Sequence, residues 1–460
     1  MTTHANILRF SFTLALLANA FMACGVAAER PTASAATLNT QSITNATDAL
    51  TSALFWGQIG DPGGYSVADV LKIARKCNPN WGTYAANHAA AHAGLMGAMA
   101  FPNPEFEMEG GRATARENDD SGNRPSRNTW GLALSQPIEM PGKRRARKIE
   151  AEAGFAVAAG EQAEFSAMLR ADVIEAYYTV QYHAAQQRLW DSLLDVSEEF
   201  HEIAKQRTKL GDAGAIEQIN AQIELFKARR ESKTAKRKSA AARSALNALT
   251  GGQLGENFKL SEGFNAAPRS ITLKQSMETA LACHPRLLRL ATELEQRYAT
   301  IDKERTAWWP DLKITLRKAA EFDANSASIA AGFEIPLWNR NQGNTAKARA
   351  MAQKTYNDII IAFNEIRRDV ETAFQNCEAA REQIASYNEG LKSASEKALA
   401  MAAAQYREGA AGYLDVLTAR RILQETEQGY IQSLYDAATA RARLELAIGK
   451  QMPMEPAKGN

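Results

Sequence analysis

The stretch SVADVLKIARKCNP at residues 66–79 has a second copy, TLKQSMETALACHP, at residues 272–285. The offset of about 200 residues is far longer than the unit of a solenoid, so the chain consists of two related halves. Three shorter pairs of segments keep the same order along the chain: 104–106 with 310–312, 211–214 with 409–412, and 249–251 with 447–449. This duplication decides the fold, because the elements predicted for one half must also occur, in the same order, in the other half.

The composition is that of a chain that folds and is close to neutral. Of its 460 residues, 45% are hydrophobic and 23% are charged, which is enough apolar sequence for a substantial core. Lys and Arg number 54 against 52 Asp and Glu, a formal net charge of +2. Proteins that bind nucleic acid usually carry a strong basic excess, so this balance argues against a nucleic-acid partner.

Residues 1–28 have the features of an export signal. Arg9 precedes an apolar run at residues 10–23, and small residues at 26–28 suit a cleavage site. This run is short for a membrane-spanning helix of about 20 residues, and no later stretch is apolar enough to be one. We therefore expect any membrane crossing by the mature chain to be made by strands.

The cysteines allow two further expectations. Cys24 lies in FMACG, which loosely matches the lipid-attachment motif of bacterial lipoproteins, so Cys24 is a candidate lipidation site; ordinary cleavage after Ala28 is the alternative. Cys77 and Cys283 occupy equivalent positions in the two halves. Equivalent points of two repeats usually lie far apart, so we expect small buried residues there rather than a disulfide.

The rest of the chain divides at composition changes. We expect an extended N-terminal arm at 29–64, a first repeat at 65–251, a linker at 252–270, a second repeat at 271–450 and a tail at 451–460. Ser66 and Thr272 are candidate N-caps, with Asp69 and Gln275 at the reciprocal capping-box position. The spacing predicts one helix after each cap, running to about residues 98 and 306.

A β-hairpin is predicted after each of these helices, at about 104–139 and 310–337. In the second copy Leu312, Ile314 and Leu316 alternate with polar residues, as in a strand with one apolar face. Tryptophans near the strand ends suit an aromatic girdle at a membrane interface: Trp130, Trp308, Trp309 and Trp338. The pattern fits a membrane hairpin or a half-buried hairpin of a soluble sheet.

Long helices follow each hairpin. Residues 143–208 contain no Pro, and apolar residues recur there at heptad spacing. The same spacing resumes after the turn at 211–214, which predicts two antiparallel arms. A helix of about 65 residues would be on the order of 100 Å long, which is rare in globular domains. The apolar positions are Leu189, Leu193, Val196, Phe200 and Ile203 on one arm and Ile216, Ile219, Ile223 and Phe226 on the other. The second copy repeats this pattern at about 345–406 and 414–446.

Four membrane strands per chain cannot close on themselves, and open strand edges cannot face lipid. Closure therefore requires further copies of the chain, eight strands for two copies or twelve for three.

Several motifs in this order resemble the TolC family of outer membrane efflux factors, and within it the heavy-metal branch typified by CzcC and CusC. The resemblance covers about residues 66–449. Besides the helix openings at 66–79 and 272–285, it rests on QPIEMPGKR at 136–144, IPLWNRNQG at 335–343, and QYREG at 405–409 followed by YLDVL at 413–417.

The resemblance implies a mainly α fold with a small β part and two internal repeats. Three protomers would form one twelve-stranded β-barrel in the outer membrane of a Gram-negative bacterium, continued in the periplasm by an α-barrel of coiled-coil helices. It implies a homotrimeric exit duct in contact with outer-membrane lipid, working with a periplasmic adaptor and an inner-membrane RND pump to export heavy-metal cations. Drugs or other organic solutes are the alternative cargo. Neither an enzymatic activity nor a cofactor is implied.

The resemblance also assigns roles at the two helical turns. The tips that an adaptor would grip are Leu210, Gly211, Gly214, Glu408, Gly409 and Gly412. Tyr406 and Asp415 match positions that line the closed periplasmic aperture, where an acidic residue repeated by three-fold symmetry selects cations. Thr418 stands where that pattern has a second acidic residue. Independently of any family, a glycine that ends a helix and a carboxylate in a first helical turn have structural explanations.

The sequence gives less support to a metal site, an enzyme, a periplasmic adaptor or a coiled-coil stalk. His88 and His92 are four residues apart and share a helical face, but no third ligand is evident, so no metal site is predicted. We find no nucleophile elbow, metalloprotease helix, nucleotide-binding glycine motif or paired CxxC motif. A periplasmic adaptor would lack the full-length duplication. A coiled-coil stalk would not need the alternating strands.

Overall fold

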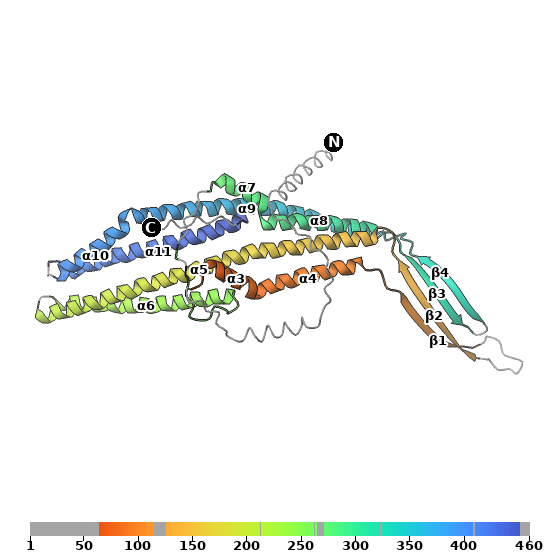
Figure 1. Ribbon diagram of the computed structural model, residues 1–460, viewed down its shortest axis with the longest axis horizontal. Coiled ribbons are helices and arrows are strands. Elements are labelled where there is room, and N and C mark those ends of the chain that lie inside the picture. The colour runs from red at the N-terminus through yellow and green to blue at the C-terminus, as the bar shows by residue number, and fades with distance from the viewer. Residues whose placement is uncertain are drawn as a thin grey trace. The chain divides into compact units, whose positions relative to one another are not determined.

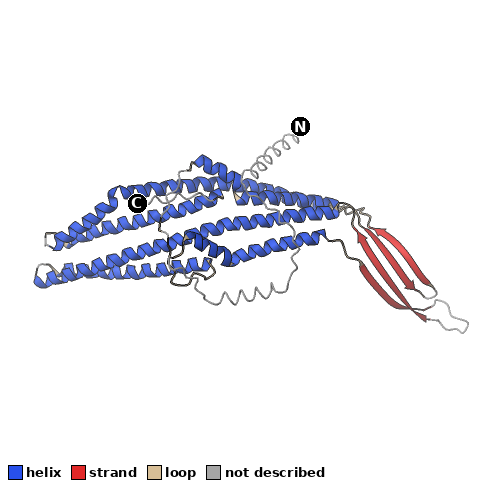
Figure 2. Cartoon of the chain, in the orientation of Figure 1, coloured by secondary structure: helices blue, strands red, loops and turns tan. Residues whose placement is uncertain are grey.

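The computed structural model describes residues 64–114, 126–211, 213–261, 263–264, 271–321, 324–407 and 410–450. The predicted signal peptide with Cys24, nearly all of the N-terminal arm, and the C-terminal tail lie outside these residues. The fold class is confirmed: long helices dominate, and four strands form one antiparallel sheet (Figure 2). Within the described ranges, no helix combines the length and the apolar character needed to cross a membrane.

The order of elements repeats along the chain, as predicted (Figure 1). The first repeat contains α3 (Val67–Cys77), α4 (Pro79–Met99), β1 (Glu105–Thr114), β2 (Ser126–Ile138), α5 (Lys143–Leu210) and α6 (Ala215–Leu249). The second contains α7 (Leu273–Cys283), α8 (Pro285–Thr306), β3 (Leu312–Ala320), β4 (Asn325–Phe333), α9 (Gln342–Ser386), the π-helical turn η1 (Tyr387–Leu391), α10 (Lys392–Arg407) and α11 (Tyr413–Ile448). The chain forms two compact units. Of the described residues, one unit contains those in 64–83, 164–285 and 363–450, and the other contains those in 84–163 and 286–362.

Both predicted capping boxes are present. The Ser66 hydroxyl accepts a hydrogen bond from the Asp69 N–H, and the Thr272 hydroxyl accepts one from the Gln275 N–H. The prediction of a single helix after each cap is wrong, because α3 ends before α4 and α7 ends before α8. The residue at each break, Asn78 or His284, is extended because a proline follows it and disfavours the helical conformation at the preceding residue.

The last residues of each repeat pack against this break. Gly251 has φ +65°, and a Cβ there would collide with the carbonyl oxygen of Cys77. Gly449 has φ +73°, and its Cβ would lie 2.6 Å from Cδ of Pro285. Glycine is thus required at the end of each repeat for two reasons. Its backbone is left-handed, and a side chain there would collide with the break between the first two helices of the same repeat.

The long helices of the two repeats differ. Helix α5 runs without interruption through 68 residues. Its predicted counterpart at 345–406 is not continuous, because η1 separates α9 from α10 and Gly390 there has a non-helical φ of 130°. Only glycine adopts this conformation readily. On the facing helix α11, a Cβ at Gly429 would collide with the hydroxyl of Tyr387, so a glycine on each helix accommodates the distortion.

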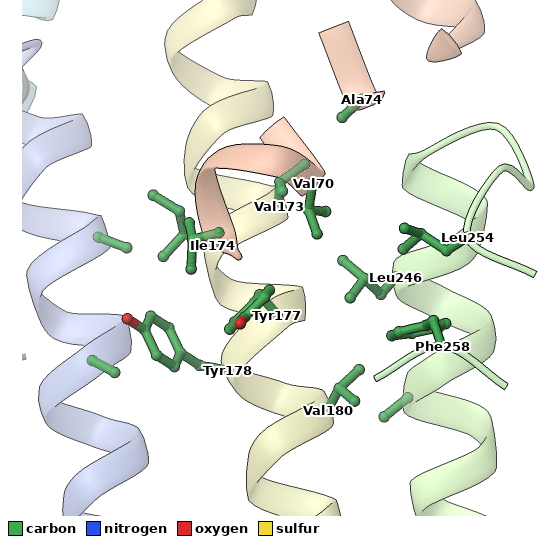
Figure 3. Packing of buried hydrophobic residues seen from close by; sticks show 14 of the residues in the cluster. Val70, Ala74, Val173, Ile174, Tyr177, Tyr178, Val180, Leu246, Leu254 and Phe258 are labelled. Carbon is green, nitrogen blue, oxygen red and sulfur yellow. The ribbon is translucent and has the colours of Figure 1, made fainter. Parts of the chain in front are cut away.

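The main core of the first unit joins α3, α5 and α6 (Figure 3). Val70, Tyr177 and Leu246 have no exposed surface in this cluster. The Tyr177 hydroxyl donates a hydrogen bond to the Tyr65 carbonyl oxygen, at 3.0 Å, which satisfies the one polar group of that side chain. Within the described residues, Cys77, Cys283 and Cys377 form no disulfide. Cys77 and Cys283 are half-buried, not buried as expected.

Helix α5 of this unit has neighbours on two sides. Toward α6, the Ser232 hydroxyl donates to Asp191 at 2.6 Å. Toward α11, Arg170 pairs with Glu445 at 2.9 Å. The predicted apolar stripe on α6 is not the face that packs on α5: Ile216, Ile219, Ile223 and Phe226 are 44–72% exposed, while Ala221, Leu225 and Ala228 are buried. The buried face of α6 thus consists of two alanines and one leucine, while the larger side chains of the predicted stripe stay exposed.

The sheet of the second unit has the strand order β1-β2-β3-β4. Its register places apolar side chains together on one face, where Leu134 pairs with Phe106 on one side and with Leu316 on the other. The opposite face carries charges on β1 and β3, with Lys313 and Glu105 2.7 Å apart and Arg317 paired with Glu109. The residues of β2 between these charges are small, so ion pairs bridge from β1 to β3 across that strand.

Replacing Gly251 with Ala should lower the free energy of unfolding by about 1–2 kcal/mol for the left-handed backbone, and further for the collision with Cys77. Gly252→Ala is the matched control, because Gly252 also has a positive φ but has open space where its Cβ would lie. Denaturant unfolding followed by tryptophan fluorescence checks that Gly251→Ala loses more stability than Gly252→Ala. Equal losses in the two variants would contradict the packing argument.

Candidate functional site

The two helical turns of the first unit end the α5–α6 and α10–α11 hairpins. At the first, Gly211 has φ +85°, the left-handed conformation expected after a helix, and Leu210 is 77% exposed. At the second, the carboxylate of Asp415 accepts a hydrogen bond from the Gly412 N–H at 3.0 Å. Glu408 and Gly409 lie outside the described residues. Leu210, Gly211, Gly214 and Gly412 are therefore the proposed docking residues that the structure places at the tips.

A buried aromatic cluster joins the two hairpins close to these turns. Tyr406 is fully buried there and contacts side chains from both hairpins. The cluster consists of Phe200 and Ala204 from α5, Ala221 from α6, Tyr406 from α10, and Tyr413 and Val416 from α11. Because each hairpin contributes to the same core, separation of their ends would expose apolar surface to water.

Polar contacts reinforce this cluster. The Tyr406 hydroxyl donates a 2.5 Å hydrogen bond to the carboxylate of Glu217, in the first turn of α6. Arg207 lies 3.7 Å from the same carboxylate, and its guanidinium stands 4.7 Å from the centre of the Tyr406 ring. Burial, together with the bond to Glu217, raises the pKa of Tyr406 well above its ordinary value, so the phenol keeps the proton that it donates.

A second charged contact lies next to the first. Arg420 of α11 is buried and lies 3.6 Å from Glu224 of α6. Burial lowers the pKa of Arg420, and the carboxylate of Glu224 acts in the opposite direction. Burial also raises the pKa of the neighbouring Tyr413 to about 12. The two hairpins are thus held together by the Tyr406–Glu217 hydrogen bond, the contact of Arg207 with the Tyr406 ring, the Arg420–Glu224 charge pair and an aromatic core. The pair of Arg207 with Glu217 lies within the α5–α6 hairpin.

The structure separates the two predicted gate residues. Tyr406 lies inside the cluster, whereas the carboxylate of Asp415 is exposed at the start of α11. Glu217 was not predicted from the sequence, although it has a counterpart in the duplication: it follows Gly214 by three residues, as Asp415 follows Gly412. Comparing the two turns position by position would have found it. No comparable signal marks Arg207 or Arg420, whose partners lie on other helices.

Residues 70–252 and 277–450 match the family described as outer membrane efflux protein. The chain belongs to this family. It is therefore an outer membrane efflux channel of tripartite systems, extending into the periplasm, and not an enzyme.

This outer membrane efflux protein is similar to two relatives and one solved structure. It is 27% identical to the cobalt-zinc-cadmium resistance protein CzcC of Cupriavidus metallidurans, over 83% of this chain and 90% of CzcC. It is 24% identical to the toluene efflux pump outer membrane protein TtgF of Pseudomonas putida, over 69% and 68% of the two chains. The CusC structure matches with a TM-score of 0.69 at 19% identity, covering 87% of this chain and 96% of CusC, which shows the fold.

Replacing Tyr406 with Phe should lower the free energy of unfolding by about 1–2 kcal/mol, because the hydrogen bond to Glu217 is lost. Combining it with Glu217→Gln should cost less than the sum of the two single changes, since both remove the same contact. Denaturant unfolding of the four proteins checks this coupling. Tyr413→Phe is the control, because within the described residues the Tyr413 hydroxyl has no hydrogen bond. Strict additivity of the first two changes would contradict the contact.

Proposed function

We propose that this channel exports heavy-metal cations. The observation that carries the proposal is the match to CzcC, which is higher in identity and in coverage than the match to the toluene-exporting TtgF. The alternative cargo is an organic solute. The channel supplies a path and its pump supplies the energy, so the cargo is decided jointly with the pump and the adaptor.

The proposed working form is a homotrimer in contact with outer-membrane lipid. Two features of the single chain support association with further copies. The sheet has an uncovered apolar face, on which Phe106, Ile329 and Phe333 are 63–78% exposed, and it has two edge strands, β1 and β4. The apolar stripe of α6 is likewise exposed. Surfaces of this kind are stable in contact with lipid or protein and unfavourable in water.

We further propose that the hairpin tips dock onto a periplasmic adaptor that links the channel to an inner-membrane RND pump. Leu210 offers a large exposed apolar side chain at one tip. Leu210→Asp should abolish chemical crosslinking of the trimer to its adaptor, while Leu210→Met, which keeps the apolar contact, should preserve it. Unchanged crosslinking of the Asp variant would remove Leu210 from the docking surface.

The tips are also the proposed gate. Tyr406 acts there by holding the hairpins together through Glu217 and Arg207. Asp415, repeated by three-fold symmetry, would place exposed carboxylates around the axis and favour cations.

Deleting the gene should lower tolerance to divalent cobalt, zinc or cadmium and leave tolerance to hydrophobic drugs unchanged. Growth inhibition measured across both sets of compounds checks this, with the intact gene restored on a plasmid as control. Loss of drug tolerance with unchanged metal tolerance would instead assign the channel to organic solutes.

Replacing Asp415 with Asn should weaken cation selectivity, because the negative charge is lost while an oxygen remains to cap the helix. In planar bilayers under a salt gradient, the reversal potential should move toward zero. Glu396→Gln removes an exposed carboxylate of α10 away from the tip and should leave the potential unchanged. A shift equal in both variants would argue for a general surface-charge effect and against a ring of Asp415 side chains.

A further inference from the structure

Helix α4 differs from its duplicated counterpart in charge. Its sequence PNWGTYAANHAAAHAGLMGAM contains no Asp, Glu, Lys or Arg, whereas charged residues occur throughout α8. None of the residues of α4 is buried. An exposed helix without charges is unusual, since exposed faces normally carry them. Any ligand that binds α4 must therefore be held by its uncharged polar and sulfur-containing side chains.

Four nitrogen and sulfur donors form a line along α4. His88, His92, Met96 and Met99 follow one another at intervals of four, four and three residues. At 3.6 residues per turn these positions fall within a sector of about 80° around the helix axis. Met96 and Met99 are 51% and 38% exposed, and His92 is exposed as well. The four donors therefore share one side of the helix, on which His88 is half-buried and the other three are exposed.

The two imidazoles have a common support. The rings of His88 and His92 lie 4.5 Å and 5.7 Å, between centroids, from the same ring of Phe155 on α5. Contact with a single aromatic ring keeps both imidazoles on one side of α4. Across the described part of the chain, neither imidazole makes a hydrogen bond or an ion pair, so the ring nitrogens are not committed to a protein partner.

The chemistry of these donors selects a class of cation. Imidazoles at positions i and i+4 of a helix can chelate one transition-metal ion, and the thioethers of methionine favour softer ions such as Cu(I) and Ag(I). Mg²⁺ and Ca²⁺ prefer carboxylate and carbonyl oxygens, and α4 has no carboxylate. A borderline or soft transition metal therefore fits this side of α4.

We propose that His88 and His92 form a two-histidine site for a borderline or soft transition-metal cation, with Met96 and Met99 continuing the line of donors along α4. Among the described residues, no group of three or more His, Cys, Asp or Glu could hold a metal ion. Water completes the coordination, so the ion is bound weakly and exchanges readily. Weak binding suits a cation in passage, since a channel must release what it binds.

The site itself rests on the geometry of α4 and Phe155, whereas its meaning as a contact for cargo rests on the proposed export of metal cations. The two are separable by experiment. The first is a property of the purified protein, and the second is a property of cells that carry the gene.

The test is a Cu²⁺ titration of the detergent-purified full-length channel, purified without a histidine tag, using calorimetry and electron paramagnetic resonance. His88→Ala with His92→Ala should weaken Cu²⁺ binding by about tenfold or more and remove the nitrogen-coupling pattern of paired imidazoles. Thr83→Ala with Asn87→Ala is the matched control, because it alters an i, i+4 pair on another side of α4. His92→Ala alone, at an exposed position, gives the same test if the double variant fails to fold.

Unchanged affinity and an unchanged nitrogen pattern in the histidine variants would overturn the site, even if gene deletion lowers metal tolerance. Conversely, loss of the nitrogen pattern in the histidine variants alone would support the site, even if deletion leaves metal tolerance unaltered. In that second case the proposed cargo fails and the metal site stands.

Discussion

The apolar face of the four-stranded sheet is the physical constraint on which the rest depends. Alternation along the strands gathers Phe106, Leu134, Leu316 and Ile329 on one side, and the described part of the chain leaves that side exposed. The other side carries charges joined by ion pairs between β1 and β3. A sheet with such different faces is stable where one face meets an apolar phase and the other meets water. An outer membrane channel provides both environments.

A second constraint acts where the hairpins end. Tyr406 is buried among residues from both hairpins, so the two tips share one small core. Its hydroxyl, Glu217 and Arg207 add contacts whose strength depends on exact placement, and Arg420 with Glu224 adds a partly desolvated charge pair. Such contacts stabilise one arrangement of the tips and are lost together if the hairpins separate. The proposed gate at this end rests on these contacts.

The two repeats kept the same scaffold and diverged in detail. The capping boxes, the proline breaks and the closing glycines occur in both, because each is required by a local backbone conformation that the duplication preserved. In contrast, α5 is continuous while its counterpart is interrupted at Gly390, and α4 has no charged residue while α8 has many. Duplicated halves that occupy different surroundings in an assembly are free to change in this way.

The sequence by itself determined the repeat, the order of elements, the alternation of the strands and the caps at Ser66 and Thr272, because these depend on short spacings that are legible along the chain. It also located the turn residues and placed Tyr406 and Asp415 near them. Only the tertiary structure decided that Tyr406 is buried with Glu217 and Arg207 while Asp415 is exposed, and that α6 packs through Ala221, Leu225 and Ala228. Those outcomes depend on which helix faces pack against one another. The packing involves segments up to about 200 residues apart, so no local sequence pattern predicts it.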